Sequence, residues 1–246
     1  MSQSFEFPGE YYEIIRQDFR DIDAETAFFD SYLPPGGSLL DVGCGTATNL
    51  RALQKIGHRC VGIDQSAAFI NYAREVSSKD IRLIHTRTAD YRSDEKFDLA
   101  FSVFVTMNYL KREELRPLLE NVHHMLKPGG YFVVDIGHML NFADNYQPYI
   151  VAHHKQGNIL ITRLIAHRVD PHQANWRHEE TIIVRDADGV TRMYENFFDQ
   201  MVLTAPEVTR YLQDAGFVVS DSFGSFRKTR PASSGRGHLI LVAQRP

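Results

Sequence analysis

Short apolar runs alternate with amphipathic segments through the first half of the chain. The runs predict buried strands over Ser38–Val42, Arg59–Ile63, Ile81–His85, Phe97–Val103 and Tyr131–Ile136. Between them, the spacing of apolar residues predicts helices over Asn49–Ile56, Ser66–Val76 and Glu113–Leu126. Strands that alternate with helices are joined by crossovers and form a parallel sheet. The pattern therefore predicts an α/β fold with a doubly wound, mostly parallel sheet.

The segment before the first strand has apolar residues at helical spacing. Over Glu10–Leu33, the residues expected to face a core are Ile14, Ile15, Phe19, Ile22, Phe28, Phe29 and Leu33. The Pro-Pro-Gly-Gly sequence at positions 34–37 ends this region. The aromatic residues near its start, Phe7, Tyr11 and Tyr12, fit either a lid over a ligand or rings packed on the core.

The helical pattern gives way to β-branched and aromatic residues after Gly137. The strands predicted there are Ile159–Val169, Glu179–Arg185 and Thr191–Gln200, with a hairpin turn at Asp188-Gly189. A last set of predicted elements comprises a helix over Pro206–Ala215 and strands over Phe217–Phe223 and His238–Val242, which bring the sheet to seven strands. We therefore expect one domain with an N-terminal helical lid (1–35), a binding core (36–136), an antiparallel β insert that caps the site (137–203) and a C-terminal helix with two strands (204–246).

A glycine loop directly after the first strand is the strongest chemical signal, with the sequence Leu-Leu-Asp-Val-Gly-Cys-Gly-Thr at positions 39–46. Its two glycines permit a tight turn and let a ligand approach the backbone. A dinucleotide dehydrogenase has a third glycine where this chain has Thr48. Asp41 is placed to bind a ligand's ammonium group, which NAD lacks. Asp64, at the end of the second strand, suits a ribose diol of either NAD or S-adenosylmethionine.

Further motifs follow the third and fourth strands and precede the fifth. They are Thr88–Tyr91, Phe97-Asp98 and Leu126–Gly130. Together with the glycine loop and Asp64, they resemble the class I S-adenosylmethionine-dependent methyltransferases over about residues 36–136. The resemblance implies S-adenosylmethionine as cofactor and S-adenosylhomocysteine as product. The cofactor-binding residues that it implies are Asp41, Gly43, Cys44, Gly45, Asp64, Gln65, Ala89, Asp90 and Val103.

A narrower resemblance covers most of the chain. It rests on the β insert together with Asn141–Asp144, Leu203-Thr204, Ala215–Phe217 and the Ser-Gly-Arg-Gly sequence at positions 234–237. These features resemble the small-molecule N-methyltransferases that dimethylate nucleotide-linked amino sugars, and also the N-methyltransferase of toxoflavin biosynthesis, which acts on a planar azapteridine. In the amino-sugar enzymes the insert covers the active site and often makes a dimer contact. The resemblance therefore implies a small-molecule substrate and a homodimer through the insert.

Two departures from the amino-sugar enzymes bear on the acceptor. Those enzymes carry a Trp-Trp pair after the fifth strand, where this chain has Asp135–Met139. They also tend to have Tyr-x-Gly-Glu near the N-terminus, where this chain has Phe7 in place of the tyrosine. The first departure disfavours a nucleotide sugar. The expected reaction is thus N-methylation of a planar nitrogen heterocycle of the azapteridine type, with a nucleotide-linked amino sugar as the alternative.

Few residues are expected to act on the acceptor directly. The candidate catalytic residues are Phe7, as an aromatic wall without the family's hydroxyl, and the polar groups of Tyr109 and His138. The candidate substrate contacts are Tyr12, Trp176 and Arg236. A lone histidine or tryptophan is more often part of a core or an interface. We therefore expect alignment of the reactants, rather than a dedicated base, to dominate the rate.

Composition narrows the class of protein further. The chain has 27 basic and 31 acidic residues and a net charge of -4, which disfavours a nucleic-acid partner. Residues Ser102–Val105 also lack the Asn/Asp-Pro-Pro-Tyr motif of DNA amino-methyltransferases. No zinc-type spacing of Cys or His is present, so no metal is expected. Apolar runs too short for a bilayer, two cysteines and no leader-like N-terminus predict a cytoplasmic protein without a membrane partner.

Overall fold

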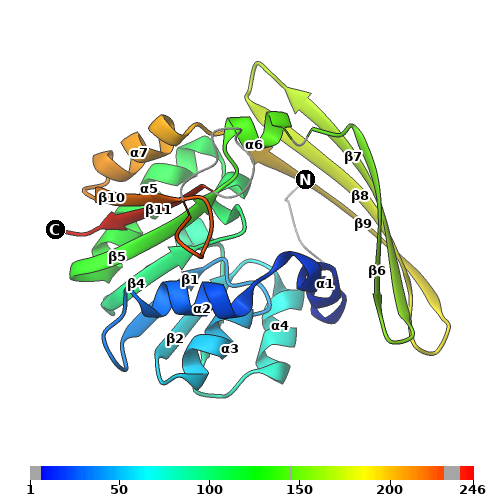
Figure 1. Cartoon of the computed structure of the whole chain (residues 1–246), viewed down its shortest axis with the longest axis horizontal. Coiled ribbons are helices and arrows are strands. Elements are labelled where there is room, and N and C mark those ends of the chain that lie inside the picture. The colour runs from blue at the N-terminus through cyan, green and yellow to red at the C-terminus, as the bar shows by residue number, and fades with distance from the viewer. Residues whose placement is uncertain (1–6, 145, 230–238) are drawn as a thin grey trace.

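A seven-stranded sheet forms the centre of the computed structural model, which describes residues 7–144, 146–229 and 239–246. Its strand order is β10-β11-β5-β4-β1-β2-β3 (Figure 1). The strands are β1 (Ser38–Val42), β2 (Arg59–Asp64), β3 (Arg82–His85), β4 (Phe97–Ser102), β5 (Leu126–Ile136), β10 (Val218–Phe223) and β11 (Leu239–Gln244). Strands β1 to β5 pair in parallel, and β11 is antiparallel to both of its neighbours. The predicted doubly wound, mostly parallel sheet is confirmed.

Helices cover both faces of this sheet because its strands are apolar on both sides. One face is covered by α2 (Ile22–Asp30), α3 (Thr48–Lys55) and α4 (Ala67–Val76), and the other by α5 (Arg112–Met125) and α7 (Ala205–Asp214). Short 3-10 helices lie at η1 (Gln17–Phe19), η2 (Thr88–Asp90) and η3 (Thr106–Tyr109). The two apolar layers hold the carboxyl ends of β1, β2 and β4 at one edge of the sheet, where the glycine loop begins.

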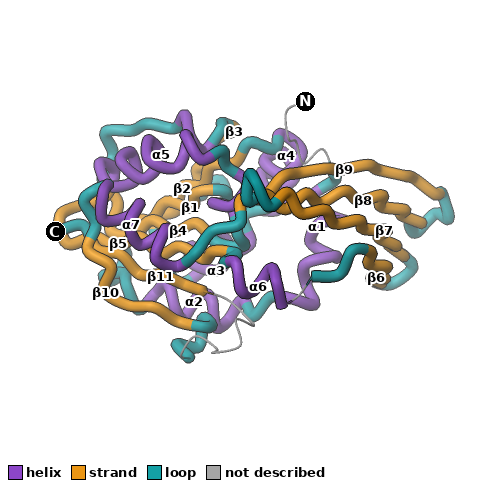
Figure 2. The backbone as a smooth tube through the Cα atoms, turned by 90° about the horizontal axis from the view of Figure 1, so that it is seen from above, coloured by secondary structure: helices purple, strands orange, loops and turns teal. Residues whose placement is uncertain are grey.

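The insert forms a separate antiparallel sheet that projects from the core (Figure 2). It contains β6 (Tyr149–Gln156), β7 (Ile159–Asp170), β8 (Asn175–Arg185) and β9 (Thr191–Met201), in that order, and α6 (Met139–Asp144) precedes it. Helix α1 (Gly9–Arg16) lies between the core and the insert. Its residues Ile14 and Ile15 share an apolar cluster with Ile161 and Ile182 of the insert. The cluster fixes α1 beside the mouth of the site.

Asn108 joins the two sheets through three hydrogen bonds. Its amide nitrogen donates to the carbonyl oxygens of Gly137 and Met201, at 2.7 Å each, and its amide oxygen accepts from the Gly137 nitrogen at 3.0 Å. The side chain is fully buried, so each of these backbone groups depends on it. Asn108 thus ties η3 to the end of β5 and to β9.

Several predicted boundaries are wrong. The region of helical spacing over Glu10–Leu33 is divided into α1, η1 and α2, and Phe19, expected to face the core, is 58% exposed. Strand β6 and helix α6 were not predicted. Strand β5 begins at Leu126 rather than Tyr131, because Gly129 and Gly130 pair with Arg245 at the end of β11. The predicted strand residue His238 lies outside the described residues.

Candidate active site

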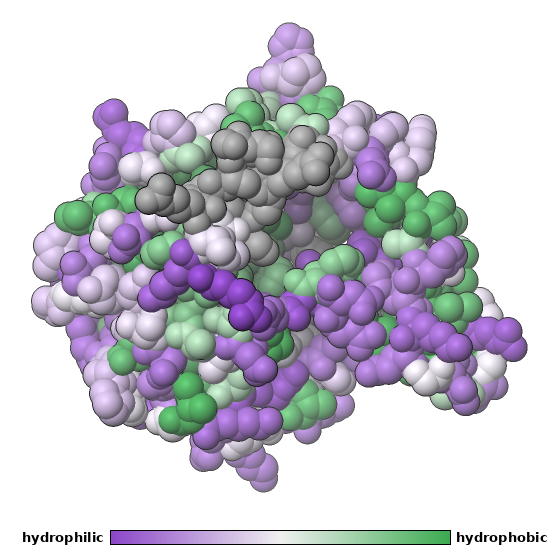
Figure 3. Space-filling view, viewed as in Figure 1, coloured by the Kyte–Doolittle hydropathy of each residue, from purple (hydrophilic) through white to green (hydrophobic). Residues whose placement is uncertain are grey.

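A cavity of about 1300 Å³ lies at the carboxyl ends of the parallel strands, and Figure 3 shows the surface hollowed between the core and the insert. The predicted cofactor residues that line it are Asp41, Gly43, Cys44, Gly45, Asp64, Gln65, Ala89 and Val103. The candidate residues Tyr12 and Tyr109 line it as well. The topology thus brings residues from β1, β2, β4, α1 and η3 to one space.

The glycine loop follows a backbone path that only small residues adopt easily. Gly43 has a φ of +89° and Gly45 a φ of +54°. A Cβ on Gly43 would lie 2.3 Å from the Cγ2 of Thr106. The backbone of the glycine loop therefore packs directly against the Thr106 side chain of η3. Asp64 holds the loop from the other side, because its carboxylate accepts hydrogen bonds from the nitrogens of Gly45 and Ser66, at 2.8 Å each.

Asp41 presents a buried carboxylate to the cavity. The residue is 3% exposed, and its Oδ1 has no hydrogen-bond partner in the part of the chain that the structure describes. Burial raises the pKa of this carboxyl well above its usual value, although the charge of Arg20 opposes the rise. A buried acceptor without a partner is costly, so this atom fits a donor such as a ligand's ammonium group.

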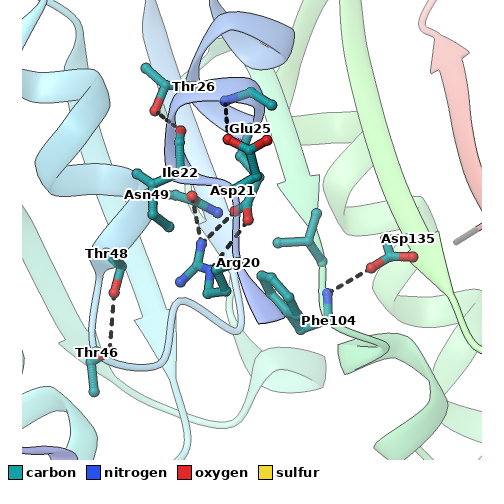
Figure 4. Close-up of polar contacts among 12 residues, drawn as sticks. Arg20, Asp21, Ile22, Glu25, Thr26, Thr46, Thr48, Asn49, Phe104 and Asp135 are labelled. Atoms are coloured by element: carbon teal, nitrogen blue, oxygen red, sulfur yellow. Dashed lines mark hydrogen bonds and ion pairs between the residues drawn. The ribbon is translucent and has the colours of Figure 1, made fainter. Parts of the chain in front are cut away.

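Arg20 is held in the cavity wall by polar contacts with Glu25 and Asn49, as Figure 4 shows. Its Nη2 donates to Glu25 Oε2 at 2.5 Å and to Asn49 Oδ1 at 2.7 Å. Its guanidinium also lies 4.5 Å from the ring centre of Phe104. Arg20 lines the cavity, and its position beside the glycine loop suits a ligand's carboxylate.

A tight turn after β4 carries Phe104 into the cavity wall. Phe104 and Val105 have φ values of +55° and +53°, and the Thr106 nitrogen donates to the Val103 oxygen at 3.4 Å. The Phe104 nitrogen donates to the buried carboxylate of Asp135 at 3.1 Å (Figure 4). Positive φ at a β-branched residue is strained. The turn is held in this form by Asp135, and it aims Phe104 at Arg16 and Arg20.

Tyr109 closes the cavity from η3. Burial raises the pKa of its hydroxyl to about 12, although the charge of Arg16 and a hydrogen bond with Gln200 oppose the rise. Its ring contacts Phe198 edge to face, with 5.0 Å between ring centres. A tyrosine with so high a pKa stays protonated at neutral pH, so it can donate or accept a hydrogen bond but is a poor base.

The other candidate residues lie elsewhere. Phe7 is buried among Tyr11 and Tyr194, with ring centres 6.0 and 5.2 Å away, and does not line the cavity. Asp90 is exposed and pairs with Arg87 at 3.3 Å. His138 is half-buried outside the cavity lining, and burial lowers its pKa.

Two substrate candidates remain. Trp176 is buried within the insert, 4.9 Å from the ring centres of both Phe142 and His167, and is not part of the cavity lining. This position matches the packing role weighed for it rather than stacking on a substrate. Arg236 lies outside the described residues.

Sequence reasoning did not single out several cavity residues. Arg16 and Arg20 come from the N-terminal segment, Phe104 and Thr106 from the turn after β4, and Asn175, Arg177 and Phe197 from the insert. No local motif marks them, because they meet only when the insert folds over the core. The strain at Phe104 and Val105 is likewise invisible in a sequence.

The residues at the sheet edge fit S-adenosylmethionine. Asp41 offers an unpaired acceptor for its ammonium group, Arg20 a cation for its carboxylate, and Asp64 a carboxylate for its ribose. Residues 39–130 match the family model described as a methyltransferase domain. The chain carries a methyltransferase domain. The sequence prediction of a class I, S-adenosylmethionine-dependent methyltransferase is therefore confirmed.

Known proteins similar to this methyltransferase extend the comparison. The dTDP-4-amino-2,3,4,6-tetradeoxy-D-glucose N,N-dimethyltransferase of Saccharopolyspora spinosa is 29% identical over 189 residues, which are 75% of this chain and 72% of that protein. The dTDP-3-amino-3,4,6-trideoxy-alpha-D-glucopyranose N,N-dimethyltransferase of Streptomyces venezuelae is 35% identical over 106 residues, 43% of this chain and 44% of that protein. A solved S-adenosylmethionine-dependent methyltransferase from Clostridium acetobutylicum ATCC 824 shares the fold, with a TM-score of 0.80, 15% identity and 96% coverage of each chain.

Two further features of the described residues bear on ligands and location. No group of three or more His, Cys, Asp or Glu side chains is arranged to hold a metal ion among them. None of their helices is long and apolar enough to cross a membrane.

Proposed function

We propose that this methyltransferase methylates the amino nitrogen of a small, nucleotide-linked amino sugar. Both relatives described above are named for such acceptors. The observation that carries the proposal is that Lys111, Arg112 and Arg177 line the same cavity as the cofactor residues. Basic side chains in the cavity wall suit the phosphates of a nucleotide.

A planar heterocycle of the azapteridine type is the second candidate. Neither relative described above is named for such a substrate. One observation favours it: the Trp-Trp pair of the amino-sugar enzymes is absent after β5, where Gly137 and His138 stand. The rings of Tyr12, Phe104 and Tyr109 along the cavity would also stack on a planar acceptor.

The protein's own task is to bind, orient and exclude water. Asp41, Arg20 and Asp64 would hold S-adenosylmethionine. That cofactor supplies an electrophilic methyl group: its C–S bond breaks as the N–C bond forms, the electron pair stays on sulfur, and the acceptor nitrogen loses a proton to water. Tyr12, Phe104 and Tyr109 would form the wall that positions the acceptor. Such alignment can contribute about 7–11 kcal/mol in favourable cases.

The test is direct. The protein is incubated with S-adenosylmethionine and either dTDP-3-amino-3,4,6-trideoxyglucose or a demethylated azapteridine, and the products are identified by mass. We expect methyl gain on the amino sugar. Gain on the azapteridine alone would replace the first acceptor by the second, and no gain on either would contradict both.

A matched pair of variants ties the activity to the site. Asp64→Asn removes the carboxylate that faces the ribose position, and Asp188→Asn makes the same change in the exposed turn between β8 and β9. We expect roughly tenfold weaker binding of S-adenosylhomocysteine, by calorimetry, in Asp64→Asn only. Equal affinities in the two variants would remove Asp64 from the cofactor site.

We also propose that the enzyme acts in the cytoplasm, without nucleic-acid or membrane partners, and as a homodimer through the insert. The net charge of -4 supports the absence of a nucleic-acid partner. The exposed apolar residues Tyr149, Val151 and Met193 of the insert support the homodimer.

A further inference from the structure

Arg16 ends α1 and turns its guanidinium into the cavity. The guanidinium carbon lies 5.1 Å from the ring centre of Tyr12 and 5.5 Å from that of Phe104. Arg20 contacts the same Phe104 ring and lies toward Asn49 and Asp41. The two arginines therefore divide the cavity: Arg20 is next to the glycine loop, and Arg16 is on the side of Tyr109 and the insert.

Arg16 differs from the other arginines of the cavity because it has no counter-ion among the residues that the structure describes. Arg20, Arg87, Arg112 and Arg177 each pair with a carboxylate, namely Glu25, Glu114, Glu207 and Asp199. No carboxylate within the described ranges lies at ion-pair distance from Arg16. The charge of Arg16 is therefore left to act on whatever occupies the cavity beside it.

The titratable and charged groups around Arg16 do not cancel this charge. Tyr12 faces it from α1, Tyr109 from η3 and Glu180 from β8, and Arg20 lies across the Phe104 ring. Burial raises the pKa of Tyr109 to about 12, so this hydroxyl carries no charge that could pair with Arg16. Glu180 is already bound by Arg163, with N–O distances of 2.9 and 2.7 Å. A positive potential thus remains at the acceptor side of the cavity.

We propose that Arg16 keeps the acceptor nitrogen unprotonated, and so replaces a general base. A cation close to an amine disfavours its ammonium form, and the proton leaves to bulk water. Arginine suits this role because it stays charged at every working pH. The inference rests on the proposed N-methylation, and it applies to an amine and to an acidic ring N–H alike. No residue on the described walls needs to accept a proton.

The proposal predicts where the pH dependence will appear. The acid limb of kcat reports ionisation in the complex, whereas the limb of kcat/KM reports the free enzyme and free substrate. With dTDP-3-amino-3,4,6-trideoxyglucose, we expect Arg16→Met to raise the kcat midpoint by about one pH unit, a tenfold change in the proton equilibrium. The kcat/KM limb should stay unchanged, and Arg16→Lys should resemble the parent enzyme. Arg210→Met, on the exposed face of α7, is the matched control.

A second measurement does not depend on turnover. The same amino sugar, labelled with ¹⁵N, is bound to protein loaded with S-adenosylhomocysteine, and its nitrogen chemical shift is followed against pH. We expect a midpoint about one unit below that in water for the parent protein, and close to the water value for Arg16→Met.

Three results would overturn the proposal. One is an equal midpoint in the parent protein and Arg16→Met. Another is a loss of S-adenosylhomocysteine affinity in Arg16→Met, which would assign Arg16 to the cofactor. The third is that the parent protein binds the amino sugar as an ammonium ion. A lowered midpoint without methyl gain would instead contradict the proposed function and leave the role of Arg16 standing, so the two can fail separately.

Discussion

Burial of the Tyr109 hydroxyl raises its pKa to about 12, so the residue stays protonated at neutral pH and is a poor base. The same burial acts on Asp41, whose carboxyl pKa also rises. In both cases the low-polarity wall disfavours the charged form. These two groups therefore offer hydrogen bonds rather than a base of ordinary pKa.

Tyr109→Phe tests this limit. Since the hydroxyl stays protonated, its removal should lower kcat less than tenfold and should leave the midpoint of the pH profile unchanged between about pH 6 and 10. Steady-state rates across that range check the prediction. A shift of the profile on this substitution would show that Tyr109 titrates during turnover.

At the scale of elements, the site depends on contacts between turns. The glycine loop after β1 meets η3 at Gly43 and Thr106, and the turn at Phe104 is held by Asp135 on β5. Each turn has a backbone conformation that the neighbouring element supports. A larger side chain at one of these turns would therefore disturb the neighbouring turn or strand, although the two are far apart in sequence.

Gly43→Ala should separate strain from steric clash. The new Cβ meets both a positive φ and the Cγ2 of Thr106 at 2.3 Å, so we expect a loss of about 2–4 kcal/mol in the free energy of unfolding. Gly36→Ala has a similar positive φ, +67°, but open space, and should lose only about 1 kcal/mol. Denaturant titration measures both. Thr106→Ser should rescue part of the Gly43→Ala loss, and its failure to do so would contradict the clash.

Glu180 is a buried acidic residue of the insert with a shifted pKa. Burial alone would raise the pKa of this carboxyl, but a hydrogen bond from His178 and the charge of Arg163 lower it to about 2. The folded-state pKa therefore lies below the ordinary value of 4.5. The ionised carboxylate stabilises the fold above about pH 4.5, and this contribution is lost as the pH falls toward 2.

Glu180→Gln should flatten that acid dependence. We expect the parent protein to lose roughly 3 kcal/mol more stability than the variant between these pH values. Glu195→Gln, at an exposed position of β9, is the matched control. Thermal unfolding as a function of pH is the measurement, and parallel curves for parent and Glu180→Gln would contradict the assigned shift.

At the scale of the whole molecule, the insert has two different faces. One packs on α1, and the other exposes Tyr149, Val151 and Met193, which are 80%, 63% and 65% exposed. Val151 lies directly opposite Leu164 on the neighbouring strand, and Figure 3 shows apolar side chains gathered over this part of the molecule. Exposed apolar patches of this kind commonly mark interfaces.

The proposed homodimer follows from that face. We expect a dimer in sedimentation analysis, and monomers when Val151→Asp and Leu164→Asp are combined. Val218→Asp, an exposed apolar position on β10 in the core, should leave the dimer intact. A monomeric parent protein would contradict a dimer through the insert.

The sequence by itself determined the part of the protein that is expected to bind the cofactor. Residues 39–64 encode strand, glycine loop, helix and strand in local order, and their apolar periods and glycines depend on near neighbours only. The fold of the S-adenosylmethionine-binding core was therefore predictable. The division of the N-terminal segment into α1, η1 and α2 and the strand β6 were not, because Phe19 and Val151 are apolar residues at exposed positions.

Only the tertiary structure decided which residues form the part of the cavity proposed for the acceptor. Arg16, Phe104 and Phe197 come from α1, the turn after β4 and β9, and no motif marks them, whereas Tyr109 is a candidate from the sequence already. The structure also placed Phe7 and Trp176 in packed apolar surroundings, although their aromatic character alone suited a ligand as well. The physical reason is that burial and long-range contacts determine the role of a side chain there. Local sequence determines a glycine loop, but it does not determine which charge is left without a partner when two sheets meet.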